Sequence, residues 1–199
     1  MHLLMKQLFD YSIAVTGIIF LLPLILLVSI ILLMLDGRPI FFIQQRVGKN
    51  NKNFKIIKFR TMVNKIDYDT QSFDLGNDER VTKFGSFLRK FKIDELPQLF
   101  NVLKGEMSIV GPRPEVRRWV DVYSERWNKV LTVNPGITDP ASILFFNESQ
   151  ILNDSQNAEY KYKNEILPRK LDLYEEYVNS QSILKDMVII LKTIKKIYL

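Results

Sequence analysis

The stretch YSIAVTGIIFLLPLILLVSIILLML, residues 11–35, contains 25 consecutive residues without a charged side chain. As one α-helix it would be about 37 Å long, which exceeds the roughly 30 Å hydrocarbon core of a bilayer. A core helix of a water-soluble domain normally keeps a polar face, which this stretch lacks. It is also too long for the apolar part of a signal peptide, and no small-residue cleavage site follows it. We therefore expect this segment to insert into a membrane.

The form of this insertion depends on Pro23, near the middle of the segment. Proline lacks a backbone N–H and its ring crowds the carbonyl four residues earlier, which predicts a kink. Basic residues lie on both flanks, with Lys6 before the segment and Arg38 and Lys49 after it. This arrangement fits a helix that enters and leaves the bilayer on the cytoplasmic side. Kinked spanning helices also occur, so these residues leave the re-entrant and the spanning form open.

The composition restricts the chemistry of the whole chain. None of its 199 residues is cysteine, and His2 is the single histidine, which excludes thiolate catalysis, disulfides, a Ser-His-Asp triad and a histidine-rich metal site. The Gly-rich phosphate loops GxGxxG and GxxxxGK[ST] are also missing. The net charge of +6 favours anionic partners such as phosphates, nucleotides or acidic lipid head groups. Catalysis would have to use carboxylates, Lys or Arg, hydroxyls and a hard cation held by oxygen ligands.

Outside the apolar segment, two short runs predict a β-hairpin. Residues 40–43 and 54–59 have strand composition, and the polar residues 46–51 between them fit a turn. Lys58 and Arg60 place positive charge around the second strand. An ordinary solvated strand face would look the same.

An acidic stretch follows the hairpin, over residues 64–80. It contains Asp67-Tyr68-Asp69, which matches the DxD pattern that binds metal in many glycosyltransferases. The pattern is short, and no alternation of strands and helices precedes it. We interpret this stretch as a surface loop.

Two amphipathic segments are expected near the centre and at the end of the chain. From Val81, apolar residues recur at three- and four-residue spacing, with basic residues on the other face. The tail from Ser182 to Leu199 has the same character. Both patterns are typical of helices that lie on anionic head groups. The alternatives are a solvated charged face for the first segment and a packing helix for the second.

Two further helices are predicted between these segments. Residues 115–131 carry an apolar face that includes Trp119 and Trp127, which we expect in the core rather than in an interfacial belt. Residues 165–177 form the second predicted helix. Together these patterns indicate a mainly α protein with a small β-hairpin, of the α+β class.

The most informative stretch for chemistry is Ile93-Asp94-Glu95-Leu96-Pro97. Pro97 indicates a new helix with Asp94 near its N-terminus, where the helix dipole stabilises carboxylates. Two capping acids would therefore be the ordinary interpretation. Their neighbours favour a catalytic site: Arg89 lies upstream, and downstream the stiff Pro-Arg-Pro element holds Arg113 in one direction. Such an arginine is suited to bidentate phosphate binding.

The order of these signals resembles the bacterial sugar transferase family, the monotopic polyprenyl-phosphate phosphoglycosyl transferases in their small single-domain form. Each matching motif is weak alone, and their shared order makes a chance match improbable. The resemblance runs from about residue 5 to residue 140, and more loosely to the end. The matching motifs are Gln45-Arg46-Val47-Gly48, Lys58-Phe59-Arg60-Thr61-Met62, Arg80-Val81-Thr82-Lys83-Phe84-Gly85, Leu88-Arg89-Lys90, Asp94-Glu95-Leu96-Pro97-Gln98-Leu99, residues 104–114 (KGEMSIVGPRP) and Pro135-Gly136-Ile137-Thr138.

The resemblance implies a mechanism and a set of site residues. Asp94 would attack the sugar-side phosphate of a UDP-sugar, release UMP and form an aspartyl-phosphosugar, which polyprenyl (undecaprenyl) phosphate would then attack. Glu95 would be its catalytic partner, with an orienting or proton-handling role. The family requires Mg²⁺, for which Asp94 is the expected protein contact. Arg89 and Arg113 would hold phosphate oxygens. The motif around the second strand adds Lys58 and Arg60 to the expected substrate-binding set.

The resemblance also implies where the protein works. Residues 1–36 would form a re-entrant membrane helix, bent at a proline that serine often precedes in the family and Leu22 precedes here. Residues 37–199 would form the catalytic domain on the cytoplasmic face of the bacterial inner membrane, in contact with its lipids. No nucleic-acid partner is expected. The sequence does not identify the sugar, the glycan pathway or the oligomeric state.

Three alternatives remain at this stage. A non-catalytic anchor or scaffold would use the basic face to bind acidic lipids and would not need Asp94. A metal-dependent glycosyltransferase would use Asp67 and Asp69 and release UDP instead of UMP. Direct transfer between the same substrates would form no adduct on Asp94.

Overall fold

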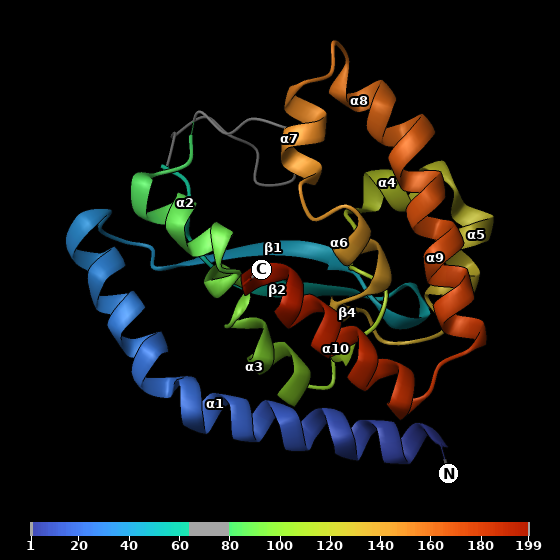
Figure 1. The fold of residues 1–199 in the computed structure, drawn as a ribbon, viewed down its shortest axis with the longest axis horizontal. Coiled ribbons are helices and arrows are strands. Elements are labelled where there is room, and N and C mark those ends of the chain that lie inside the picture. Colours follow the sequence, from blue (N-terminus) through green and yellow to red (C-terminus); the bar gives the residue numbers. More distant parts are fainter. Residues whose placement is uncertain (1, 64–79, 199) are drawn as a thin grey trace.

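The computed structural model describes residues 2–63 and 80–198, which form a mainly helical protein with a small hairpin (Figure 1). This confirms the predicted class. In chain order the elements are α1 (His2–Leu35), β1 (Phe41–Val47), η1 (Lys49–Asn51), β2 (Asn53–Phe59), α2 (Lys83–Lys90), η2 (Ile93–Glu95), α3 (Gln98–Leu103), β3 (Ser108–Val110), α4 (Arg117–Val122), α5 (Ser124–Val130), β4 (Gly136–Thr138), α6 (Pro140–Leu144), α7 (Glu148–Asn153), α8 (Ala158–Lys161), η3 (Tyr162–Ile166), α9 (Leu167–Asn179) and α10 (Ile183–Tyr198).

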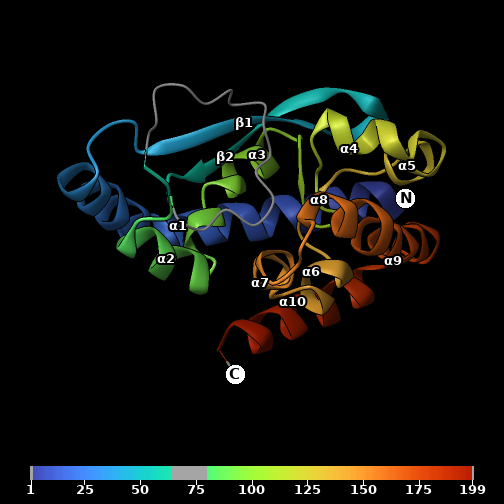
Figure 2. The same cartoon turned by 90° about the horizontal axis from the view of Figure 1, so that it is seen from above.

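The hairpin confirms the first strand prediction. β1 and β2 pair antiparallel from Phe41 opposite Phe59 to Val47 opposite Asn53. Asn50, in the connecting turn, has a positive φ of 55°, a conformation that asparagine adopts more readily than most residues. Seen from above, the hairpin lies on one side of the molecule and α10 on the other, with α1 and α3 between them in this direction (Figure 2).

A second strand pair was not predicted. β3 and β4 are parallel, with Ser108 opposite Gly136 and Val110 opposite Thr138. The backbones of these two segments approach each other so closely that a Cβ on Gly136 would lie 2.1 Å from the backbone nitrogen of Gly111. Only glycine therefore fits at position 136. Three-residue strands are too short for a periodic pattern to reveal. This pair is important for the site because the Pro-Arg-Pro element directly follows β3.

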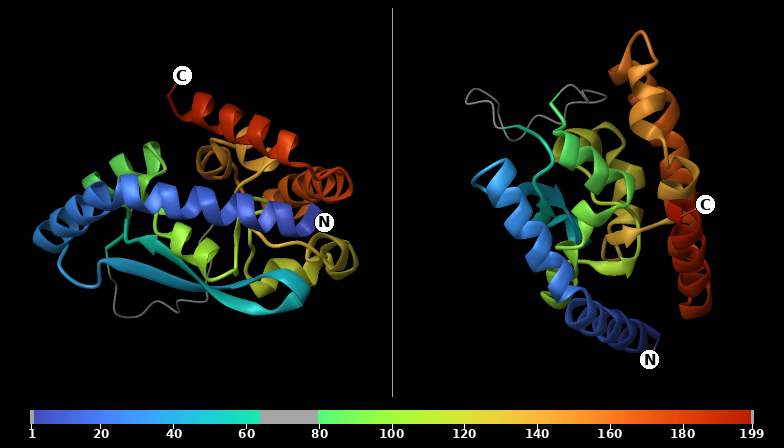
Figure 3. Two further views of the ribbon diagram at one scale, coloured as in Figure 1. Left: turned by 90° about the horizontal axis from the view of Figure 1, so that it is seen from below. Right: turned by 60° about the vertical axis from the view of Figure 1, so that its left-hand side comes forward.

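The long apolar helix α1 is bent near its middle and lies on the outside of the molecule (Figures 1 and 3). Pro23 is inside it, as the predicted kink requires. Ala14, Val28 and Leu32 are buried against the folded body, whereas Phe20 is 78% exposed. Among the described residues, α1 is the helix that is long and apolar enough to cross a membrane. Its unburied apolar face fits insertion better than a place in a protein core.

The predicted single helix over residues 115–131 is wrong. The chain forms α4 and α5 with a break at Tyr123, which has φ −130° and ψ 50°. The break has a packing reason: Trp119 contacts Tyr162 and Trp127 contacts Tyr174, with ring centroids 4.9 and 6.0 Å apart. Both indoles are 1% exposed, which confirms their prediction as core residues.

The two amphipathic segments form α2 and α10. In α10, Asp186 and Ile189 are buried, which confirms a packing face. The same helix exposes large apolar residues on its other side, among them Leu184 at 76% and Leu191 at 64%. The helix therefore packs on the protein and also offers an apolar surface, which satisfies both interpretations of the tail.

Candidate active site

The carboxylate pair lies in the short turn η2, between α2 and α3. Lys92, two residues after the end of α2, has a left-handed conformation, φ 56° and ψ 20°, and turns the chain into η2. Pro97 then precedes α3, as its position in the sequence indicated. Ile93 and Leu96 pack against the cluster that contains α1 residues. These apolar contacts attach the carboxylate-bearing turn to the membrane helix.

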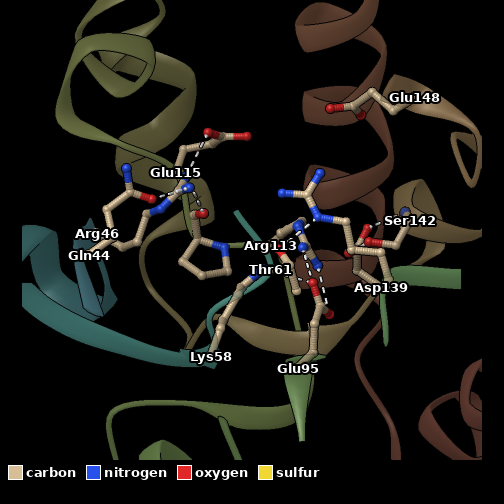
Figure 4. A network of polar contacts seen from close by, with 12 residues as sticks. Gln44, Arg46, Lys58, Thr61, Glu95, Arg113, Glu115, Asp139, Ser142 and Glu148 are labelled. Carbon is tan, nitrogen blue, oxygen red and sulfur yellow. Dashed lines mark hydrogen bonds and ion pairs between the residues drawn. The ribbon is translucent and has the colours of Figure 1, made fainter. Parts of the chain in front are cut away.

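Glu95 is buried and holds two cations (Figure 4). Lys58 Nζ donates to its Oε1 over 2.8 Å. Arg113 binds both carboxylate oxygens, Nη1 to Oε2 at 3.3 Å and Nη2 to Oε1 at shorter range. Burial alone would raise the pKa of Glu95, but the charges of Arg113 and Lys58 hold that pKa well below its ordinary value. Glu95 is therefore a permanent anion that orients two cations.

Asp94 differs from its neighbour because one of its carboxylate oxygens, Oδ1, lacks a hydrogen-bond partner among the described residues. It is 8% exposed, and its enclosed Oδ1 accepts no hydrogen bond from the residues that the structure describes. Burial, followed by the charge of Glu95, raises the pKa of Asp94; the positive charges of Lys58, Lys92 and Arg89 oppose this rise. A buried carboxylate without a donor is costly, and such groups are typical of functional sites. Asp94 is thus available to a ligand or a reaction.

Three of the four cations expected to bind substrate, Lys58, Arg89 and Arg113, act on the carboxylate pair. The fourth, Arg60, points elsewhere. Lys58 from β2 and Arg113 from the Pro-Arg-Pro element meet at Glu95. Arg113 keeps 28% of its side chain exposed, so it can still reach a ligand. Burial lowers the pKa of Lys58 despite the nearby carboxylate. Arg89 comes from α2, and its Nε donates to Thr61 Oγ1 over 2.9 Å.

Arg60 points to another part of the molecule. Its guanidinium donates to the carbonyls of Asp36, Gly37 and Arg38, at 2.6, 2.9 and 2.9 Å. These carbonyls follow the end of α1, where a helix leaves acceptors unsatisfied. Arg60 therefore anchors the chain just after the end of α1, and we leave it out of the phosphate-binding set.

The sequence did not reveal how Arg113 is held in place. Arg46 Nη1 lies 3.4 Å from both the Pro114 carbonyl and Glu115 Oε2, and the Tyr162 hydroxyl donates to the other Glu115 oxygen. These contacts fix the backbone next to Arg113. The Gln45-Arg46-Val47-Gly48 motif indicated that Arg46 matters, but its sequence does not predict that Arg46 pairs with Glu115.

Asp94 can supply one carboxylate oxygen as a protein ligand for Mg²⁺. Within residues 2–63 and 80–198, no group of three acidic or histidine side chains could hold a metal by itself. Mg²⁺ is commonly bound by one or two carboxylates with substrate phosphates and water as the other ligands. The partnerless oxygen of Asp94 meets that requirement. The Asp67-Tyr68-Asp69 motif lies outside the described residues.

Among the described residues, Asp94 thus combines a carboxylate oxygen that has no hydrogen-bond partner with nearby cations and with a turn that packs against the long apolar helix α1. The chain belongs to the bacterial sugar transferase family, whose model matches residues 1–199. It is 35% identical over 195 residues to the UDP-N-acetylgalactosamine-undecaprenyl-phosphate N-acetylgalactosaminephosphotransferase of Aeromonas hydrophila, covering 96% of this chain and 43% of the relative.

Two other relatives differ in the share of their own length that this chain covers. The exopolysaccharide production protein ExoY of Sinorhizobium fredii is 36% identical over 209 residues, 98% of this chain and 85% of ExoY. The undecaprenyl-phosphate glucose phosphotransferase of Komagataeibacter xylinus is 36% identical over 201 residues, 98% of this chain and 36% of the relative. The chain thus spans most of ExoY and less than half of the two phosphotransferases.

Proposed function

We propose that this protein transfers a sugar-1-phosphate from a UDP-sugar to a polyprenyl phosphate and releases UMP. The product would start the assembly of a polysaccharide or another glycoconjugate. The observation that carries the proposal is Asp94, a buried carboxylate whose Oδ1 has no hydrogen-bond partner among the described residues and whose pKa the charges of Lys58, Lys92 and Arg89 act on. The relatives whose names specify undecaprenyl phosphate support the acceptor class.

In the first step, a carboxylate oxygen of Asp94 attacks the sugar-side phosphorus of the UDP-sugar. The new bond joins that oxygen to phosphorus, and the pyrophosphate P–O bond to UMP breaks, so UMP leaves with the electron pair. An anion that attacks a pyrophosphate meets like-charge repulsion, which the cations around Glu95 reduce. Asp94 must be deprotonated to react. Bound Mg²⁺ would add positive charge at the phosphate oxygens.

In the second step, a phosphate oxygen of the lipid acceptor attacks the same phosphorus. The bond between phosphorus and Asp94 breaks, the carboxylate is regenerated and a polyprenyl diphosphosugar leaves. Dividing one difficult transfer into two easier ones is the usual benefit of a covalent intermediate. Glu95 keeps Arg113 and Lys58 in position throughout, because the charges of these two cations hold its pKa well below the ordinary value and favour its carboxylate form.

We propose further that α1 enters and leaves the membrane on one side, which we take to be the cytoplasmic face. Both ends of α1 bind the same folded body. At the N-terminal end, Lys6 donates to Asp186 over 2.7 Å and Asp10 accepts from Ser108 over 2.7 Å. At the other end, Arg60 holds the carbonyls just after the helix. A straight spanning helix would place these two ends on opposite sides of the bilayer.

The decisive experiment combines a panel of UDP-sugars with undecaprenyl phosphate and measures the released nucleotide. We expect UMP from the wild type with at least one sugar, and almost none from Asp94→Asn. A glycosyltransferase would release UDP instead. An anchor or scaffold would release neither. Trapping a sugar-phosphate adduct on Asp94 distinguishes the two-step route from direct transfer.

A further inference from the structure

Three residues from separate parts of the chain meet beside the carboxylate pair, and we call them the Phe146 cluster: Lys92, Phe146 and Lys196. Lys92 lies between α2 and η2, Phe146 between α6 and α7, and Lys196 in the last turn of α10. The ammonium of Lys92 lies 5.3 Å from the centre of the Phe146 ring, and that of Lys196 lies 5.9 Å from it. Tertiary folding thus brings two positive charges to one ring.

Lys92 lies close enough to the carboxylate pair for its charge to oppose the rise in the pKa of Asp94 and to help lower the pKa of Glu95. Across the described parts of the chain, no carboxylate forms an ion pair with Lys92 or Lys196. The ring of Phe146 is half-buried, and a cation–π contact is a weak interaction. It leaves the three N–H donors of each ammonium open to other acceptors. An anion that accepts hydrogen bonds from both lysines would offset their mutual repulsion.

The backbone of Lys92 is a second and independent observation. It lies just after α2 with φ 56°, in the left-handed region where glycine is the usual residue. A lysine there lowers the stability of the fold, because its Cβ is crowded in this conformation. Retaining a lysine where glycine would be more stable indicates that its side chain has a use. Lys92 also acts on the pKa of Asp94, which places its charge close to the proposed nucleophile.

The surroundings indicate an amphiphilic ligand. Phe87, Leu144 and Ile194 are close in sequence to the three cluster residues, and they are 49%, 53% and 49% exposed. Two ammonium groups on segments that also expose large apolar side chains fit a molecule with an anionic head and a hydrocarbon tail. The nucleotide-sugar has no such tail, and Arg113 and Lys58 are already grouped at Glu95 for its phosphates.

We propose that the Phe146 cluster binds the phosphate of the polyprenyl phosphate acceptor, with Lys92 and Lys196 as hydrogen-bond donors. This inference rests on the proposed function and adds a location for its second substrate. The phosphate then waits next to Asp94 while the first step takes place. One of its oxygens attacks phosphorus, and the bond from phosphorus to Asp94 breaks. The hydrocarbon chain lies along the exposed apolar residues of α2 and α10.

The test uses Lys196→Gln and Lys92→Gly in the full-length protein, with Lys195→Gln as the matched control. Lys195 is an exposed neighbour on α10 and loses the same charge. With a UDP-sugar that the wild type uses, we expect the ratio of the acceptor KM to the donor KM to rise about ten-fold in both cluster variants. The control should stay within about two-fold of the wild type. Lys92→Gly should also melt at the same or a higher temperature.

A binding measurement separates this inference from the proposed function. Radiolabelled undecaprenyl phosphate is retained by the protein in detergent micelles, with undecaprenol as the uncharged comparison. We expect the wild type to prefer the phosphate and both variants to lose about ten-fold in affinity for it. Retention within two-fold of the wild type in both variants would overturn the inference, even if UMP release proceeds normally. Normal phosphate preference without any UMP release would instead contradict the proposed function.

Discussion

The two ends of α1 each lie near a buried acidic cluster, and the difference between these clusters is instructive. At the N-terminal end every carboxylate oxygen has a donor: Asp186 accepts from Lys6 and Tyr177, and Asp10 accepts from Ser108 and the Ile109 amide. Near the other end, Glu95 is equally well bound, but Asp94 Oδ1 has no partner in the part of the chain that the structure describes.

Burial alone therefore does not identify a functional acid. A buried carboxylate with all its donors contributes to the fold, whereas one without donors is a cost that the rest of the structure must offset. The comparison predicts opposite results for the same substitution at the two ends. At Asp186 the substitution to asparagine should affect stability, and at Asp94 it should affect activity.

The largest expected effect is the loss of activity in Asp94→Asn. Removing the nucleophile should lower UMP release by at least about a thousand-fold. The free energy of unfolding should stay the same or increase, because a buried charge without donors disappears. Both quantities are measured on protein purified in detergent, with exposed Asp154→Asn as the control. Activity within ten-fold of the wild type would contradict the nucleophile assignment.

The next effect is on stability, in Asp186→Asn. Breaking the buried pair with Lys6 should lower the free energy of unfolding by about 3 kcal/mol, since the buried ammonium loses its 2.7 Å contact and keeps only the longer pair with Asp10, at 3.6 Å. UMP release per folded molecule should stay near the wild-type value. Asp121→Asn is the matched control: Asp121 is 63% exposed and 3.9 Å from Arg117, so its loss should cost under about 0.5 kcal/mol. Equal destabilisation of both variants would refute the comparison.

A smaller effect is expected from Arg113→Lys, which keeps the charge and removes the two-pronged contact with Glu95. Lysine is a point charge and cannot bind a carboxylate or phosphate through two parallel N–H groups. We expect UMP release to fall about ten- to hundred-fold. Arg118→Lys is the control, because its pair with Glu159 is more than half exposed. Kinetics with both substrates varied would reveal the difference, and wild-type rates in Arg113→Lys would exclude a role in phosphate binding.

The smallest effect is a shift of the pH–rate profile. Asp94 reacts as the anion, and burial together with Glu95 raises its pKa, so activity should fall on acidification at a higher pH than an ordinary aspartate would give. In Glu95→Gln the nearby negative charge is gone, so the residual activity should persist to lower pH. An acid limb that does not move, measured by UMP release over pH, would contradict the coupling of the two acids.

The two acids should also affect stability in opposite directions. The folded pKa of Asp94 is raised, so its contribution to stability is fully present below its unfolded pKa and is lost as the pH rises through the folded pKa. The folded pKa of Glu95 is depressed, so its contribution is present above its unfolded pKa and is lost as the pH falls through the folded pKa. Chemical denaturation of the two single variants over pH separates these contributions.

Much of the fold followed from local patterns. The charge-free run predicted α1, Pro23 predicted its bend, and two runs of strand composition on either side of a polar turn predicted the hairpin. These local patterns gave a wrong prediction, or none, where contacts between residues far apart in the sequence determine the structure. The break at Tyr123 depends on two indoles that pack against the aromatic rings of η3 and α9, and the β3–β4 pair depends on the close approach of Gly111 and Gly136.

The amino-acid sequence by itself determined the membrane helix, the mainly helical class and the motifs that group Asp94, Glu95 and Arg113, because these depend on residue type and short spacing. Only the tertiary structure decided which carboxylate is free. Glu95 is neutralised by Lys58 from a strand and Arg113 from a loop, and Arg60, which the same motif supplies, faces the end of α1 instead. Electrostatic roles depend on distances between segments far apart in the chain, and those distances exist only after folding.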